Sequence, residues 1–146
     1  MKIVKKDILT VDHGVILHQV NCYGKFNKGL TKSIREKFPK AYQEYLKYVQ
    51  NKTPEELLGS YNDVRINDLL VVVNCFSQKN YGNDGKLYTN YIAMETIFRN
   101  VYREYCLDRY PFYITYGYGC GLAGGDWDKV SEIIEKTIPE AIVCEL

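Results

Sequence analysis

The sequence has neither a long apolar run nor an excess of either charge. No stretch of about 18 consecutive apolar residues occurs, which excludes a membrane-spanning helix of ordinary length. The 19 Lys and Arg residues nearly balance the 18 Asp and Glu residues, so the basic excess typical of nucleic-acid-binding proteins is missing. Residues 1–7 lack the continuous apolar core of a signal peptide. We therefore expect a cytoplasmic protein with no membrane partner and no nucleic-acid partner.

Signatures of disulfides and metal sites are also missing. The five cysteines are odd in number and widely spaced, and no C-x-x-C pair occurs, which argues against a disulfide framework and a zinc site. Only two histidines are present, and the acidic residues are not clustered with the spacing of metal ligands. We therefore expect no metal and no cofactor.

The composition is that of one ordinary domain. A chain of 146 residues can bury about two-thirds of its unfolded surface and so form a sizeable core. The sequence contains no repeat, linker or low-complexity segment, which predicts a single domain over residues 1–146, expected to be a monomer. The 14 tyrosines are expected in the core or along a groove, with some free to stack on a flat ligand.

The most unusual stretch is Tyr118–Trp127, which has four glycines between Gly119 and Gly125. An apolar, strand-like run precedes it, and an amphipathic helical pattern follows it. Glycines allow backbone N–H groups to approach an anion, and the start of the next helix adds free N–H groups and a positive dipole end. The stretch therefore predicts a phosphate-binding loop, with a plain strand-to-helix connector as the alternative. It matches neither common phosphate-loop pattern.

Apolar periodicity predicts alternating strands and helices. A short strand is expected from Lys2 that ends by Thr10. Asn67 and Asp68 are expected to form the turn of an antiparallel hairpin. The expected strands are 15–17, 61–66, 69–75, 112–116 and 141–144, and the expected helices are 33–38 with a restart at Pro39, a single turn from Thr53 to Gly59, 89–106 and 128–137.

This order predicts an α/β sandwich with a mixed sheet. Polar loops with glycines follow the strands that end near residues 20, 75 and 117. Ligands of open α/β sheets bind beyond the carboxyl ends of the strands. The three loops are therefore expected to converge on one cleft.

Several polar residues of these loops are candidates for a site, each with a structural alternative. Asn21 could bond sugar hydroxyls, and Tyr81 could stack on a base or pack in a groove. His18 could be a proton donor, a base or a buried structural residue. Asp126 could activate a water molecule or cap the next helix. Asp7 could accept from an exocyclic amine or lie in a solvated turn.

The cysteines of the loops are less suited to catalysis. Cys22 and Cys120 lack the arginine-rich surroundings that activate a thiolate nucleophile, and no arginine follows Arg109. We therefore expect both to be packing residues.

Five segments of the chain fit one known family together. They are Asp7-Ile8, His18-Gln19-Val20-Asn21, Asn27-Lys28-Gly29-Leu30, the middle-loop group Gln78, Tyr81, Gly82, Lys86 and Tyr88, and Gly119–Trp127. With this combination the chain resembles a macrodomain, in particular the small ADP-ribose-1″-phosphate phosphatase-like macrodomains of yeast, bacteria and phages. The resemblance covers nearly the whole chain. It implies a three-layer α/β/α sandwich with a mixed central sheet.

The resemblance also implies a role for each matching residue. Asp7 and Ile8 would meet the adenine, and Asn21 would bond the distal ribose. His18 and Asp126 would lie near C1″ of that ribose as the catalytic pair. The residues that would bracket the diphosphate or otherwise line the ligand are Gly29, Leu30, Gln78, Tyr81, Gly119, Cys120, Gly121, Leu122, Ala123 and Gly124.

The implied activity is the metal-independent hydrolysis of ADP-ribose-1″-phosphate to ADP-ribose and phosphate. Two alternatives remain: an ADP-ribosyl hydrolase that acts on modified protein or nucleic acid, and a non-catalytic binder of ADP-ribose or a related nucleotide. Related macrodomains that remove ADP-ribose from carboxylates carry an Asp where this chain has Ala123, and their catalytic lysine has no clear counterpart here. The chain also has Lys6 and Asn27-Lys28 where the family has glycines.

Overall fold

The near-continuous apolar runs form the centre of the sheet. The computed structural model describes residues 1–146. Strand β2 (Gly14–Gln19) lies between β4 (Leu70–Cys75) and β5 (Phe112–Thr115) and pairs parallel to both. A strand between parallel neighbours with helices on both faces needs apolar side chains on both sides. Residues 14–18 of β2 are accordingly all buried.

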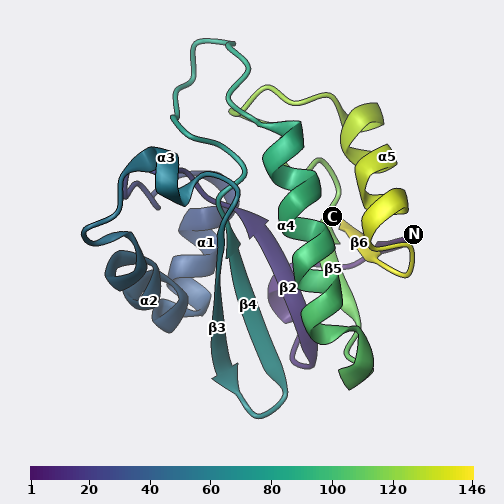
Figure 1. The fold of residues 1–146 in the computed structure, drawn as a ribbon. Coiled ribbons are helices and arrows are strands. Elements are labelled where there is room, and N and C mark those ends of the chain that lie inside the picture. The colour runs from purple at the N-terminus through teal and green to yellow at the C-terminus, as the bar shows by residue number, and fades with distance from the viewer.

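The other strands complete a mixed six-stranded sheet in the order β1-β6-β5-β2-β4-β3 (Figure 1). Strands β1 (Lys2–Lys5) and β6 (Ile142–Glu145) are parallel to their neighbours. Strand β3 (Tyr61–Asn67) is antiparallel to β4 and closes the far edge. The hairpin predicted from the sequence is therefore confirmed.

Helices cover both faces of the sheet, as the predicted α/β/α sandwich requires. On one face, α4 (Tyr91–Tyr105) and α5 (Trp127–Thr137) pack on alternate residues of the strands, such as Val15 and Val71. On the other face, α1 (Gly29–Lys37) and α2 (Pro39–Val49) pack on the intervening residues, such as Ile16. The strand period of two thus produces two separate cores.

The helix boundaries follow local chemistry. Pro39 begins α2 directly after α1, as expected from its effect on the preceding residue. Thr53 and Glu56 form a capping box on the short helix α3 (Pro54–Leu57). Asn90 caps α4 and Asp126 caps α5 through their side chains. The predicted helices therefore exist. Their boundaries differ from the predicted ones by one or two residues, except that α1 begins at Gly29, four residues before the predicted start.

Two local predictions are wrong. The first strand ends at Lys5, because the Asp7 side chain accepts from the Leu9 backbone N–H at 3.0 Å and starts a short 3₁₀ helix, Ile8–Thr10. The hairpin turn lies one residue later than expected. There Asn67 Oδ1 accepts from the Leu69 backbone N–H at 2.8 Å, so Asn67 still belongs to β3.

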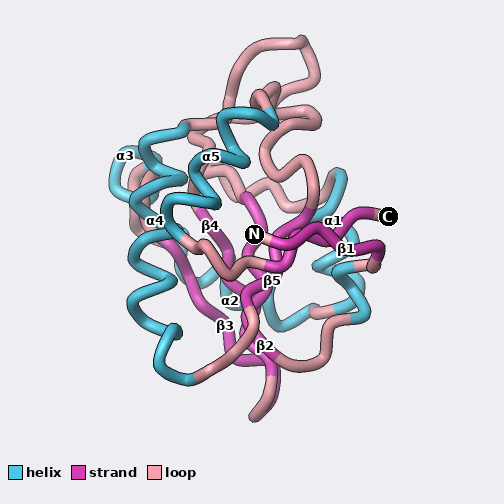
Figure 2. Tube along the Cα trace, turned by 90° about the vertical axis from the view of Figure 1, so that its right-hand side faces the viewer, coloured by secondary structure: helices cyan, strands magenta, loops and turns pink.

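The remaining segments are connections and one further turn. A second 3₁₀ helix, Cys106–Asp108, ends α4. The long connections after β2, β4 and β5 gather at one end of the sheet (Figures 1 and 2). Among the helices, none combines the length and the apolar character that a membrane span requires.

Replacing Gly14 by alanine should destabilise the fold. Gly14 has φ +129°, and a Cβ there would lie 2.5 Å from the Pro111 carbonyl oxygen, at the start of two parallel pairings. We expect Gly14→Ala to lower the free energy of unfolding by about 2 kcal/mol, measured by urea denaturation. Gly121→Ala is the control, because a Cβ there meets nothing within 4 Å. An equal loss in both variants would contradict the steric explanation.

Candidate ligand-binding site

The connections after β2, β4 and β5 enclose one large cavity. Its volume is about 950 Å³, and 27 residues line it, a size suited to a small organic ligand. The lining includes Val20, Gln78 and Gly119, one from each of the three connections. The expected convergence of the three loops on one cleft is therefore confirmed.

The glycine loop offers unpaired backbone N–H groups to this cavity. The amides of Gly119, Gly121, Leu122 and Ala123 donate no hydrogen bond within the protein. All four residues line the cavity. Gly119 is partly buried and Ala123 is buried, whereas Gly121 and Leu122 are exposed. Buried N–H groups call for a partner, and a cluster of free N–H groups favours an anion.

A second set of free N–H groups lies at the start of α1. The N-cap of this nine-residue helix is Lys28, which makes no side-chain cap. The amides of Gly29, Leu30 and Thr31 make no hydrogen bond in the protein, and all three residues line the cavity. The first turn of a helix carries a partial positive charge. The α1 terminus and the glycine loop therefore present donors to the same cavity.

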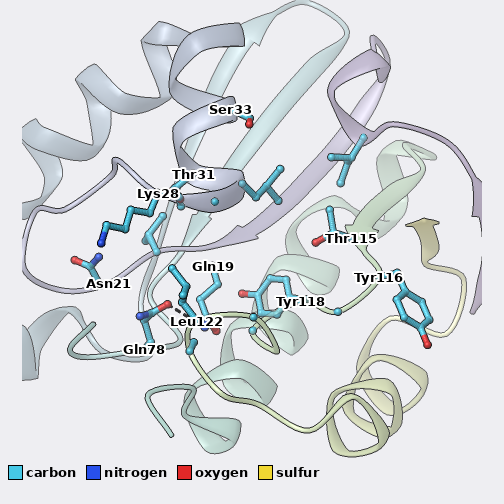
Figure 3. Close-up of a pocket in the computed structure, with 18 of the residues that line it drawn as sticks. Gln19, Asn21, Lys28, Thr31, Ser33, Gln78, Thr115, Tyr116, Tyr118 and Leu122 are labelled. Carbon is cyan, nitrogen blue, oxygen red and sulfur yellow. Dashed lines mark hydrogen bonds between the residues drawn. The ribbon is translucent and has the colours of Figure 1, made fainter. Parts of the chain in front are cut away.

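The charged side chains around the cavity are mostly basic. Lys6, Lys25 and Lys28 line it, whereas Asp7 is its single acidic side chain. Lys25 and Lys28 belong to none of the salt bridges of the protein. Lys28 and Asn21 lie together at one end of the cavity, and Tyr116 lies at the other (Figure 3). The electrostatic field in the cavity thus favours an anionic ligand. The positive charge of Lys28 strengthens this field at its end of the cavity.

Most of the predicted ligand-binding residues lie on the cavity wall. Cys120 and Gly124 are exceptions, since they belong to the glycine loop but do not line the cavity. The predicted residues that do line it are Asp7, Ile8, Asn21, Gly29, Leu30, Gln78, Tyr81, Gly119, Gly121, Leu122 and Ala123. Their contact with a ligand stays a prediction.

The two predicted catalytic residues are not brought together in the cavity. His18 is fully buried and does not line it. Its Nε2 lies 2.6 Å from Asn74 Oδ1. Asn74 Nδ2 donates to Ala41 O and to Asn62 Oδ1, so Asn74 Oδ1 is the acceptor and His18 Nε2 carries the proton.

The protonation of His18 also follows from its burial. Desolvation lowers its pKa from 6.5 to about 4, against the opposing effect of the hydrogen bond to Asn74. His18 is therefore neutral near pH 7, and its Nδ1 is a buried acceptor without a partner. This arrangement corresponds to the structural role that the sequence left open for His18, and direct contact with a ligand in the cavity does not follow from it.

Asp126 has the helix-capping role that competed with catalysis in the sequence. Its Oδ1 accepts from the Asp128 backbone N–H at 3.0 Å, and its own N–H donates to Tyr91 Oη at 3.0 Å. Asp126 is exposed and does not line the cavity. The catalytic role of Asp126, which the resemblance implied, stays a prediction.

The side chain of Asn21 forms most of its hydrogen bonds with the backbone of its own loop. Its Oδ1 accepts from the backbone N–H groups of Tyr23 and Lys25 at 3.0 and 3.3 Å. Its Nδ2 donates to the Lys25 carbonyl at 2.8 Å, and Tyr45 Oη donates to the Asn21 carbonyl at 2.9 Å. Asn21 therefore fixes the loop that carries Lys25 and keeps one N–H free for a ligand.

The thiols near the loops are not activated. Burial raises the pKa of Cys22 to about 11, and burial together with the Asp126 carboxylate raises the pKa of Cys120. Both are protonated near pH 7, as the expected packing role requires. No group of His, Cys, Asp and Glu side chains is arranged to hold a metal ion.

Some residues of the site were missed in the sequence. Gln19 lines the cavity and bonds to both Gln78 and Thr89, although nothing in the local sequence distinguishes it from its neighbours. Tyr116 also lines the cavity and packs on Trp127, with ring centroids 4.5 Å apart. Their positions at the ends of two predicted strands could have indicated them, because the ends of the strands form the cleft.

Comparison with known proteins defines the fold. No protein-family model matches the sequence, and no curated protein matches it. A protein of unknown function from Bacteroides thetaiotaomicron is similar in structure, with a TM-score of 0.88 and 25% identity, over 99% of this chain and 97% of that one. The macrodomain of Mycobacterium tuberculosis DarG has a TM-score of 0.78 and 17% identity, over 99% of this chain and 95% of that one.

A further structure was solved with a ligand. Thermosipho africanus DarTG in complex with ADP-ribose has a TM-score of 0.78 and 17% identity, over 99% of this chain and 40% of that one. The likeness extends over nearly the whole of this chain, and the Mycobacterium tuberculosis neighbour is a macrodomain. This chain therefore has the macrodomain fold, the fold that the sequence resemblance implied.

Stability should fall in mild acid because of His18. The unfolded chain binds a proton on this imidazole below about pH 6.5, whereas the folded protein does so only near pH 4. The unfolded state thus binds more protons between pH 6.5 and pH 4. The contribution of His18 to the free energy of unfolding is therefore complete above pH 6.5 and is lost as the pH falls toward 4. We expect it to reach about 3 kcal/mol.

Urea denaturation of the wild type and of His18→Gln between pH 7 and pH 4 measures this contribution. The variant lacks the titrating imidazole, and the carboxylates are common to both proteins. The wild type should lose more stability over the window than the variant. Parallel pH profiles would show that His18 does not titrate as its burial predicts.

Proposed function

We propose that this protein binds ADP-ribose in the cavity. The observation that carries the proposal is the pair of unpaired N–H clusters, one at the α1 terminus and one in the glycine loop, along the same cavity. Two donor clusters suit the two phosphates of a diphosphate. The cavity of about 950 Å³ has room for a nucleoside and a second sugar on either side.

Each remaining part of the ligand has a matching group on the wall. Asp7 uses Oδ1 for the Leu9 N–H, so its second oxygen is free to accept from the amino group of adenine. Asn21 keeps one amide N–H for a hydroxyl of the distal ribose. The structural likeness to Thermosipho africanus DarTG, solved with ADP-ribose, supports the same ligand.

A carboxylate placed among the donors should strongly weaken the binding of ADP-ribose. Gly121 lines the cavity and has open space where a Cβ would lie, so Gly121→Glu should fold normally. We expect its affinity for ADP-ribose to fall about 100-fold, because the new charge repels the diphosphate at short range. Isothermal titration calorimetry measures this loss.

Gly121→Gln is the matched control for size. It should retain most of the affinity, and raising the salt concentration should narrow the gap between the two variants. Equal losses of affinity in both variants would show that the size of the new side chain, and not its charge, weakens binding. A wild-type protein that does not bind ADP-ribose would refute the proposed function.

Hydrolysis of ADP-ribose-1″-phosphate is the second candidate function. Lys25 and Lys28 favour it, because two lysines without acidic partners near Asn21 suit a ligand with one more phosphate at the distal ribose. The side chains that line the cavity include no histidine and no glutamate. A water molecule bound beside the lysines would have to be the nucleophile.

Phosphate release from ADP-ribose-1″-phosphate tests this candidate. Because neither His18 nor Asp126 lines the cavity, we expect His18→Ala and Asp126→Ala to keep the turnover of the wild type in the fraction of protein that is folded. We expect Lys25→Ala with Lys28→Ala to lower it at least tenfold. Loss of turnover in folded Asp126→Ala would restore the catalytic role that the resemblance implies.

No specific observation favours removal of ADP-ribose from modified macromolecules. Lys79, the lysine that follows Gln78, pairs with Glu55 at 2.7 Å and does not line the cavity. Ala123 stands where related enzymes carry an acidic residue, and its side chain offers no catalytic group. This alternative therefore ranks below the other two.

A further inference from the structure

The carbonyl groups of the glycine loop are held by the segment that precedes α4. Gly119 O accepts from Thr89 Oγ1 at 2.6 Å and from the Gly125 N–H at 2.8 Å. Ala123 O accepts from the N–H groups of Tyr88 and Thr89 at 2.7 and 3.1 Å. Thr89 therefore contacts the loop at both ends, through its hydroxyl and through its backbone.

Gln19 determines the direction of the Thr89 hydroxyl. Gln19 Nε2 donates to Thr89 Oγ1 at 2.9 Å and to Gln78 Oε1 at 3.0 Å, and its Oε1 accepts from Ser77 Oγ at 2.6 Å. Because Thr89 Oγ1 accepts from Gln19, its single hydrogen is left for Gly119 O. One polar chain thus runs from the end of β2 through Thr89 to the glycine loop.

The contact between these segments is close, and Thr89 is buried in it. Gly119 has φ +70°, and a Cβ there would lie 2.9 Å from Thr89 Oγ1 and 3.2 Å from Gln19 Oε1. Thr89 is 4% exposed, and it does not line the cavity. Thr89 therefore acts on the loop from behind and has no direct path to a ligand.

A loop that binds an anion must direct N–H groups toward it and carbonyl oxygens away from it, since a carbonyl oxygen repels a phosphate. The loop carbonyls of Gly119 and Ala123 are bonded to Thr89, and four N–H groups of the same loop are free. We propose that Thr89, oriented by Gln19, is a positioning residue that holds the glycine loop in its phosphate-binding conformation. This inference rests on the proposed binding of ADP-ribose.

Thr89→Val removes the hydroxyl and keeps the shape of the side chain. We expect its affinity for ADP-ribose to fall about tenfold, because Gly119 O loses a partner and the loop must be ordered by the ligand. Thr89→Ser should restore the affinity, since it regains the hydroxyl. Calorimetric titration with ADP-ribose measures both, and thermal unfolding is recorded for each variant.

Thr137→Val is the matched control. Thr137 is also buried, at 5% exposure, and its hydroxyl donates to Ile133 O within α5, outside the cavity. It should lose stability like Thr89→Val but keep the wild-type affinity. An equal loss of affinity in Thr137→Val, or no rescue by Thr89→Ser, would overturn the positioning role.

The backbone amide signals of Gly119, Gly121, Leu122 and Ala123 in ¹⁵N NMR spectra of the free protein give a readout independent of ADP-ribose. Thr89→Val and Gln19→Met should both shift or broaden these signals, and Thr137→Val should leave them unchanged. Unchanged signals in the first two variants would refute the inference. If the two variants show these shifts but the wild type does not bind ADP-ribose, the proposed function alone is refuted. Titration with inorganic pyrophosphate would then test whether the loop binds phosphate groups.

Discussion

The parallel pairing of β2 with both β4 and β5 is the constraint on which the rest of the structure depends. Parallel neighbours with helices on both faces require apolar side chains along the strands, so polar groups are confined to the strand ends. Because the three strands run in one direction, their following loops meet at one edge of the sheet. The cavity, its free N–H groups and the Gln19–Thr89 chain all lie at this edge.

One polar pair departs from this rule inside the sheet. His18 and Asn74 face each other across β2 and β4 and are both fully buried. Asn74 satisfies its two amide hydrogens on Ala41 and Asn62 and accepts from His18. The pair extends the α1–α2 core by one polar layer directly below the loops. His18, which its motif suggested as a catalytic residue, thus belongs to the layer that supports the site.

Much of the fold and part of the site were predictable, for reasons that differ between residues. Val15 to Leu17 and Leu70 to Val73 predict buried strands from their own apolar pattern, and Pro39 predicts a helix restart from its own geometry. The glycine loop around Gly121 predicts a phosphate-binding loop through its local composition, whereas the role of Gly29 was implied only by the family resemblance. Gln19 and Thr89 could not be found in this way, because their role depends on hydrogen bonds between segments that are 70 residues apart.

The sequence by itself determined the alternation of strands and helices, the glycine loop and the three polar strand ends, because each depends on residues that are close in the chain. Only the tertiary structure decided the order of the strands, the burial of His18, the capping role of Asp126 and the orientation of the loop carbonyls. The physical reason is that the burial of a side chain and its hydrogen-bond partners depend on its position in the folded structure. The residues around the His18–Asn74 pair come from the loop after β2, from α2 and from β3, and no local pattern specifies that meeting.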